Sequence, residues 1–207
     1  HHHKDVYEHT LTVVDNVSPV LIRRLGALFH DIAKPNTKGI ENGKVHFRHH
    51  EVVAAKMTKK ILQNLKYDKK TIKNVASLVE LHLRPHTFKM GWTDSAVRRY
   101  IVDAGEVLED LNNLVRADVT TKNKQKAQEI FEKLDEMETR IKEVLEKEEM
   151  SKLRPPISGD EIMSLFDLEP GPKVGEIMKA LYEQRINEGE VSKEEAIKLA
   201  KETFNNL

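Results

Sequence analysis

Four side chains in this sequence could together hold a divalent metal ion. His30 and Asp31 are adjacent, His9 lies upstream of them and Asp118 lies downstream. Imidazole nitrogen and carboxylate oxygen suit a borderline or hard divalent cation, and the chain has no cysteine that could offer a thiolate. A His-Asp pair occurs by chance in many proteins. The prediction therefore depends on whether the surrounding elements turn these residues toward one another.

The elements that must position these residues are helices, and the candidate ligands continue their apolar stripes. His9 lies three residues after Val6, His50 three before Val53, His82 three after Val79, and Asp118 four after Leu114. A buried carboxylate is destabilising unless it is paired or bound to metal, and a buried unpaired Asp is rare. Each histidine alone is typical of a hydrogen-bonded core residue. Together they favour a metal site over a polar cluster or a set of helix caps.

This arrangement predicts one or two metal ions. His9, His30, Asp31 and Asp118 would bind one ion, and His50 with His82 could hold a second ion bridged through Asp31. Ligand softness permits Mn, Fe, Co, Ni, Zn or Mg. Such ions lower the pKa of bound water and neutralise charge on a phosphoryl group. Asp31 and Lys34 are the catalytic candidates, since Lys34 could reach a phosphate oxygen. Its alternative role is that of a lysine facing a helix C-terminus.

The fold class predicted from the sequence is all-α. Apolar residues recur at helical spacing along almost the whole chain, while alternation with a period of two is hard to find. Pro35 to Gly43 reads as a loop with a short irregular excursion. A main helical body over residues 1–150 and a smaller helical tail over 151–207 are expected, with the break at Leu153-Arg-Pro-Pro156.

Several helix starts are also predicted. Asp94 is the expected N-cap of a helix between Trp92 and Ala104. Ser158 with Glu161 and Ser192 with Glu195 have the spacing of capping boxes.

Composition limits the classes of function. The 207-residue chain has a formal net charge of zero, which argues against strong non-specific nucleic-acid binding by the chain as a whole. Lysines nevertheless cluster between Lys56 and Lys73 and between Lys122 and Lys126, where solvated helix faces are the simplest explanation. No apolar run is long enough to span a membrane, and no signal peptide is evident. With no cysteine, a cytoplasmic location is expected. His1 to His3 have the composition of a purification-tag remnant.

The order His9, His30-Asp31, Asp118 resembles the HD superfamily of metal-dependent phosphohydrolases, and His50 and His82 resemble the extra ligands of its two-metal members. A closer likeness covers nearly the whole chain. Seven stretches look like the HD-containing C-terminal half of bacterial tRNA nucleotidyltransferases, the CCA-adding enzymes. In the main body they are His3–Leu11, Leu28–Pro35, His49–Met57, Trp92–Tyr100 and Leu114–Thr121, and in the tail they are Glu169–Gly175 and Ser192–Ala196.

The resemblance implies that the HD body hydrolyses phosphate esters, such as 2′,3′-cyclic phosphates or 2′-nucleotides, and that the tail helps to hold tRNA. The candidates for binding phosphate or RNA are then Arg98, Arg99, Arg116 and Lys122. Adjacent Arg98 and Arg99 point in different directions on a helix, so at most one is expected to face a ligand. Ion pairing with nearby Glu is the alternative for each.

One departure from the family pattern matters. Nucleotide addition in that family depends on an N-terminal head with an Asp-x-Asp metal pair, and this sequence has no two Asp residues spaced two apart. The chain is therefore either a fragment of a longer enzyme or a standalone relative.

The function expected first is a divalent-metal-dependent phosphohydrolase acting on nucleotide or RNA-terminal phosphate esters. The alternative is the RNA-binding HD and tail portion of a CCA-adding enzyme, without catalysis of its own. A nucleoside triphosphate hydrolase is a third option. A nucleotide or another phosphate ester, and tRNA, are the expected partners.

Overall fold

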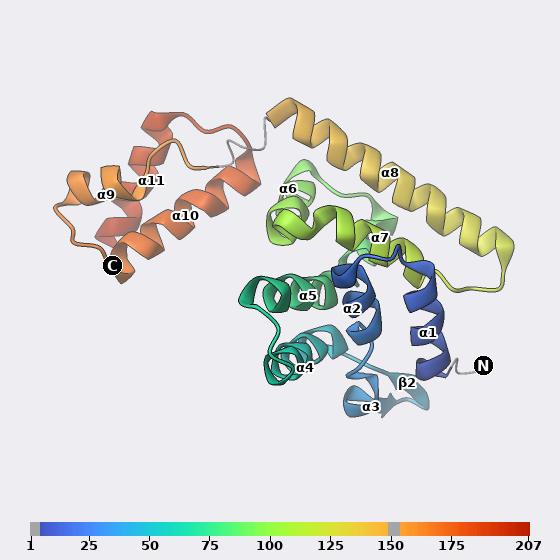
Figure 1. Ribbon diagram of the computed structural model, residues 1–207. Coiled ribbons are helices and arrows are strands. Elements are labelled where there is room, and N and C mark those ends of the chain that lie inside the picture. Colours follow the sequence, from blue (N-terminus) through green and yellow to red (C-terminus); the bar gives the residue numbers. More distant parts are fainter. Residues whose placement is uncertain (1–4, 149–153) are drawn as a thin grey trace. The chain divides into compact units, whose positions relative to one another are not determined.

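The computed structural model describes residues 5–148 and 154–207, and nearly all regular structure in these ranges is helical (Figure 1). The all-α prediction is confirmed. The strands described there, β1 (Gly39–Glu41) and β2 (Lys44–His46), pair in an antiparallel hairpin. Asn42 and Gly43 join them with φ angles of 51° and 72°, as the tightest hairpin turns require. The hairpin lies where the sequence predicts a loop with an irregular excursion.

Backbone contacts divide the chain into two compact units. The first comprises the residues up to Gly91 together with Ile101–Met137, and the second comprises Trp92–Tyr100 and Glu138–Leu207. The predicted boundary at residue 150, the start of the predicted break at Leu153, and the tag-like His1 to His3 all lie outside the described residues. The division into 1–150 and 151–207 therefore stays a prediction.

Short helices joined by tight loops build the first unit. They are α1 (Val6–Asn16), α2 (Leu21–Phe29), α3 (Lys34–Thr37), α4 (His50–Asn64), α5 (Lys69–Leu81), η1 (Arg84–Met90), η2 (Gly105–Val107) and α7 (Leu108–Asp118). Two further helices, α6 (Asp94–Ala104) and α8 (Lys124–Glu148), contribute residues to both units. Within the described ranges, no helix combines the length and the apolarity needed to cross a bilayer.

The core of the first unit lies between α2, α4 and α5, while α1 and α7 pack against α2. Leu62, Val75 and Val79 are completely buried there. Some apolar residues that stand at helical spacing in the sequence are instead exposed. Leu65 is 61% exposed because α4 ends at Asn64, and Leu21 at the start of α2 is 56% exposed. Helical spacing identified the buried faces, but it overestimated how far they extend.

The second unit contains α9 (Gly159–Phe166), α10 (Pro172–Glu188) and α11 (Lys193–Asn205), which bury a separate apolar core. Both predicted capping boxes are confirmed, because Ser158 and Ser192 each exchange hydrogen bonds with the Glu three residues later. The start of α6 differs slightly from the prediction. The Thr93 hydroxyl accepts a hydrogen bond from the Ala96 backbone N–H over 3.3 Å, so the N-cap of α6 lies one residue before Asp94.

Candidate metal centre

The predicted ligands converge in the first unit, and most of them lie at helix ends. His30 follows the last residue of α2 and His82 follows the last residue of α5, whereas His50 begins α4 and Asp118 ends α7. At a helix terminus the chain changes direction, so side chains from separate helices can point at one place. The sequence predicted that these residues would meet through helix faces. The structure brings the same residues together through helix ends.

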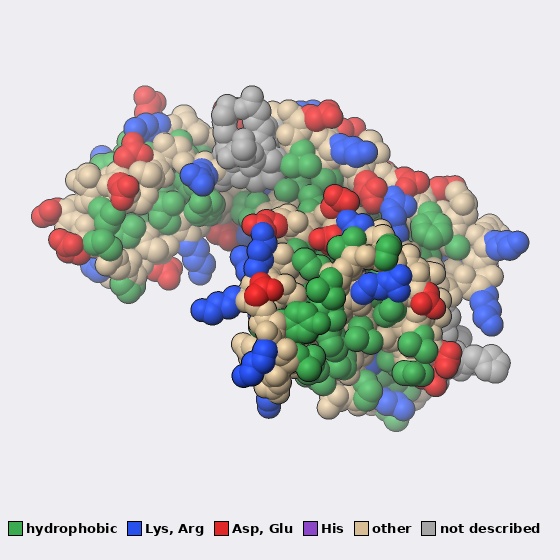
Figure 2. All heavy atoms as spheres, viewed as in Figure 1, with side chains coloured by type: hydrophobic (Ala, Val, Ile, Leu, Met, Phe, Trp, Pro, Cys, Tyr) green, Lys and Arg blue, Asp and Glu red, His purple; other side chains and the backbone are tan. Residues whose placement is uncertain are grey.

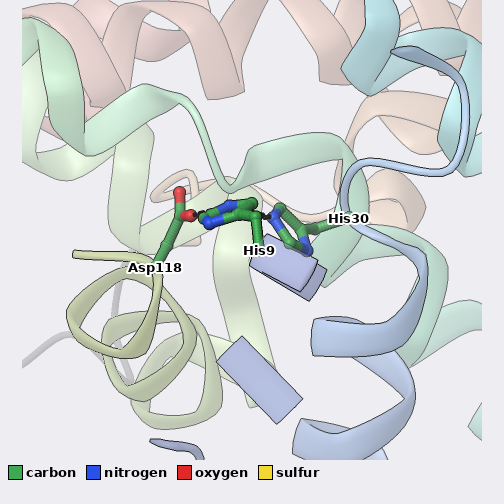
Figure 3. A group of neighbouring side chains, drawn as sticks. All are labelled: His9, His30 and Asp118. Carbon is green, nitrogen blue, oxygen red and sulfur yellow. Dashed lines mark hydrogen bonds and ion pairs between the residues drawn. The ribbon is translucent and has the colours of Figure 1, made fainter. Parts of the chain in front are cut away.

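Three of these residues form the first group, which Figure 3 shows. The Nε2 atom of His9 lies 2.9 Å from Asp118 Oδ1 and 3.3 Å from the Nε2 atom of His30. The ligand atoms of all three lie within 4.8 Å of one another. His30 is 1% exposed, whereas the side chains of His9 and Asp118 are 12% and 15% exposed. The group is thus buried on one side and accessible on the other.

Asp31 connects this group to a second one, formed with His50 and His82. Its Oδ2 atom lies 3.5 Å from Nε2 of His9 and 3.3 Å from Nε2 of His30. Its Oδ1 atom lies 3.3 Å from Nε2 of His50 and 4.0 Å from Nε2 of His82. The two carboxylate oxygens therefore face different groups, as a bridging ligand requires.

The histidines are oriented by hydrogen bonds on the far side of each ring. In His30, His50 and His82, Nδ1 donates to the carbonyl oxygen of the residue three positions earlier, over 2.7, 2.8 and 2.7 Å. In a neutral ring this fixes the proton on Nδ1 and leaves a lone pair on Nε2. The His9 ring is held at Nδ1 by the Thr120 hydroxyl, 2.9 Å away. Every Nε2 atom then points into the centre.

The interior of the centre therefore consists of hydrogen-bond acceptors. Neutral imidazole lone pairs and carboxylate oxygens cannot bond to one another without a cation or an added proton between them. Within the described chain, the buried atoms Asp31 Oδ1 and His50 Nε2 have no hydrogen-bond partner. Unpaired buried polar atoms are destabilising. This donor set fits a divalent metal that takes nitrogen and oxygen ligands.

Protons can partly take the place of a cation here. Burial disfavours a charged His30, but hydrogen bonds to Asp118 and Asp31 raise its pKa to about 10. Burial and repulsion from His30 lower the pKa of His82 to about 4. Burial opposes ionisation of Asp31 and Asp118, yet hydrogen bonds to the histidines hold the pKa of each carboxyl well below its usual range. A metal ion would replace the His30 proton.

A cavity of about 340 Å³ opens beside the centre. Its lining residues come from α1, the His30–Lys34 turn, η1, the end of α7 and the start of α8: Val6, His9, Asp31, Lys34, His86, Asp118, Val119, Thr120, Thr121, Lys126 and Ile130. Lys34 has its Nζ atom 2.6 Å from Asp31 Oδ2 and 5.9 Å from the centre of the Phe47 ring. The predicted catalytic lysine thus lines the cavity and contacts a predicted ligand.

Two residues of this site were not predicted from the sequence. His86 lies at the cavity, with its Nε2 atom 3.9 Å from Asp118 Oδ2. Thr120 orients His9 across 111 positions of the chain. The available signals were weak: His86 follows His82 by four residues, and Thr120 follows Asp118 by two.

Two of the predicted phosphate-binding or RNA-binding residues belong to the second unit. Arg98 is 7% exposed and donates to the Ile186 carbonyl oxygen over 3.0 Å. Arg99 forms a two-pronged ion pair with Glu183. Both arginines contact α10, and ion pairing, the predicted alternative to ligand binding, is what Arg99 makes.

The other two belong to the first unit. Arg116 is ion-paired with Asp135, and Lys122 is exposed between α7 and α8. Neither residue lines the cavity beside the candidate metal centre. A role for these four residues in binding RNA stays a prediction.

Comparisons with known proteins identify relatives of this chain. A family model for tRNA nucleotidyltransferase domain 2 matches residues 47–200. The chain is 35% identical over 204 residues to a CC-adding tRNA nucleotidyltransferase of Thermus thermophilus, and the aligned region covers 94% of this chain and 44% of the relative. It is 33% identical over 193 residues to an A-adding tRNA nucleotidyltransferase of Deinococcus radiodurans, covering 89% and 43%. The chain thus spans less than half the length of these relatives.

Proposed function

Because the chain belongs to the tRNA nucleotidyltransferase domain 2 family, we propose that it holds tRNA for a nucleotidyltransferase rather than adding nucleotides itself. The observation that carries this proposal is the extent of the family match, which runs from residue 47 to residue 200 and includes residues of both units. The absence of an Asp-x-Asp pair from the sequence supports the second half of the proposal.

The distribution of charge offers a surface for RNA in the first unit. Between Lys56 and Lys73 the sequence has seven lysines and a single acidic residue, Asp68, although the whole chain is neutral. All seven lysines are exposed. They lie on α4, on α5 and on the turn that joins these helices. Basic side chains project at the edge of the molecule in this region in Figure 2. Clustered lysines of this kind bind phosphates through electrostatic attraction and counterion release.

The test is the binding of fluorescently labelled tRNA, followed by anisotropy at several salt concentrations. Replacing Lys59, Lys60, Lys66 and Lys73 with Gln should weaken binding at low salt at least roughly tenfold, and it should lower the slope of log K against log salt by up to about four. The control replaces two exposed lysines of the acidic part of α8, Lys142 and Lys147, with Gln, and the losses are compared per charge removed. Equal losses in both variants, or no tRNA binding by the wild type, would contradict the proposal.

A second function is supported by a different observation, namely the acceptor-only interior of the metal centre and the cavity beside it. A divalent ion held by such ligands polarises a phosphoryl oxygen and lowers the pKa of bound water. In this proposal His9, His30, Asp31, His50, His82 and Asp118 bind metal, and Lys34 orients a phosphate oxygen. The activity would be hydrolysis of a nucleotide or RNA-terminal phosphate ester.

Asp118→Ala separates the two functions. We expect phosphate release from 2′,3′-cyclic nucleotides or 2′-nucleotides, measured with Mn, Ni, Co or Mg added to metal-stripped protein, to fall below detection in this variant. The reason is that Asp118 supplies a ligand oxygen 2.9 Å from the His9 nitrogen. Binding of tRNA should be unchanged. The exposed Asp15→Ala serves as the control. A metal-loaded wild type without turnover would eliminate the hydrolase and leave the tRNA-holding proposal intact.

A further inference from the structure

The start of α8 has an unusual charge. Its first turn contains Lys124 and Lys126 and no acidic residue. The N-terminus of a helix carries partial positive charge, so acidic side chains are favoured there and lysines are unfavourable. The Asn123 side chain accepts the Lys126 amide over 3.1 Å, which caps the helix without neutralising it. Uncompensated positive charge at this position suits an anion.

Only one of these two lysines faces the cavity. Lys126 and Ile130 both line it, and their spacing of four residues places them on the same face of α8. Lys124 precedes Lys126 by two residues, which on a helix turns its side chain away, and it does not line the cavity. The hydroxyl-bearing residues Thr120 and Thr121, just before α8, line the same wall. The cavity therefore has a wall formed by α8 and the segment that precedes it, in which Lys126 and two threonines stand beside the apolar side chains of Val119 and Ile130.

The charge of the cavity depends on metal. The ionised carboxylates that line it, Asp31 and Asp118, balance its two lysines, Lys34 and Lys126. Each bound divalent ion would then add two positive charges to a cavity that is otherwise neutral. The Oδ1 atom of Asp31 has no hydrogen-bond partner among the described residues and faces His50 and His82, so this buried acceptor supports a bound ion beside the cavity. A loaded cavity of this volume suits a small anion better than a cation or a neutral molecule.

We propose that Lys126 binds oxygens of a phosphate group in this cavity, opposite the metal centre, and that it shares the phosphate with Lys34. The ligand class is a phosphate ester or inorganic phosphate, small enough for a cavity of about 340 Å³. This assignment deepens the hydrolase function proposed above and rests on it. It adds a substrate-positioning residue, contributed by α8, to the residues predicted from the sequence.

The experiment measures the affinity of Mn²⁺-loaded protein for inorganic phosphate by calorimetry. Lys126→Met should weaken phosphate binding about tenfold, the loss expected for one charge-assisted hydrogen bond. The matched control, Lys124→Met, removes the same charge from the same helical turn and should change the affinity by less than about twofold. The Mn²⁺ stoichiometry should be equal in all three proteins.

A second readout guards against misfolding. Without metal or phosphate, Lys126→Met should melt at the wild-type temperature or slightly above it, because it removes an unfavourable charge from a helix N-terminus. The proposal is wrong if loaded wild-type protein does not bind phosphate, or if Lys124→Met weakens binding as much as Lys126→Met. If phosphate binding depends on Lys126 but the protein hydrolyses no phosphate ester, the anion site is supported and only the proposed hydrolase activity is refuted.

Discussion

Asp31→Asn is expected to remove metal from both ligand groups at once. Asp31 Oδ2 faces His9 and His30, whereas Oδ1 faces His50 and His82. An asparagine of the same shape has no negative charge, and it presents an amide nitrogen that donates hydrogen bonds in place of one ligand oxygen. The protein should therefore lose its one or two bound ions together. Elemental analysis after equilibrium dialysis measures the metal content directly.

Comparison variants make this result specific. Asp15→Asn changes an exposed carboxylate on α1 and should leave the metal content at the wild-type value. His82→Ala removes a ligand of the second group only, so ions bound by His9, His30 and Asp118 should remain. Full metal content in Asp31→Asn would show that the carboxylate does not bridge the two groups.

The sequence predicted the centre because its ligands interrupt apolar patterns. His30, Asp31 and His82 are each 1% exposed in the structure, and a polar residue at such a position needs a partner that the pattern itself does not supply. Helical spacing selected four of the six residues that the fold brings together, and the adjacent pair His30 and Asp31 supplied the other two. Metal binding by those residues stays a prediction. The helix caps at Ser158 and Ser192 were equally predictable, since capping is local.

What the sequence could not predict depends on contacts between distant segments. Thr120 and His9 are 111 residues apart in the chain, and they meet because α1 and α7 pack together. Lys126 was one of three similar lysines, and only the path of α8 past the cavity distinguishes it. Arg98 was a candidate for binding phosphate or RNA, yet it is buried and donates a hydrogen bond to a backbone carbonyl oxygen. Residue type gives the available chemistry, whereas tertiary packing decides which residues use it.

Removing metal should also lower the stability of the first unit. A ligand that binds only the folded state stabilises it by about 4 kcal/mol when free ligand is 1,000 times its dissociation constant. For a unit of this size that corresponds to a fall in melting temperature on the order of 10 °C after chelation. The metal-free protein should stay folded, because its core between α2, α4 and α5 does not include the ligands.

Circular dichroism melts with and without EDTA, followed by metal restoration, measure this effect. Asp31→Asn provides the control, since a protein that binds no metal should melt at one temperature with or without the chelator. Its melting temperature should lie near that of chelated wild type or below it, because the Lys34 ammonium would lose a partner 2.6 Å away. If chelation left the wild-type melting temperature unchanged, the converging lone pairs would have to be satisfied by protons alone. A protonated His30, whose pKa is raised to about 10, is the source of such a proton, so the melts distinguish a centre that holds metal from one that holds protons.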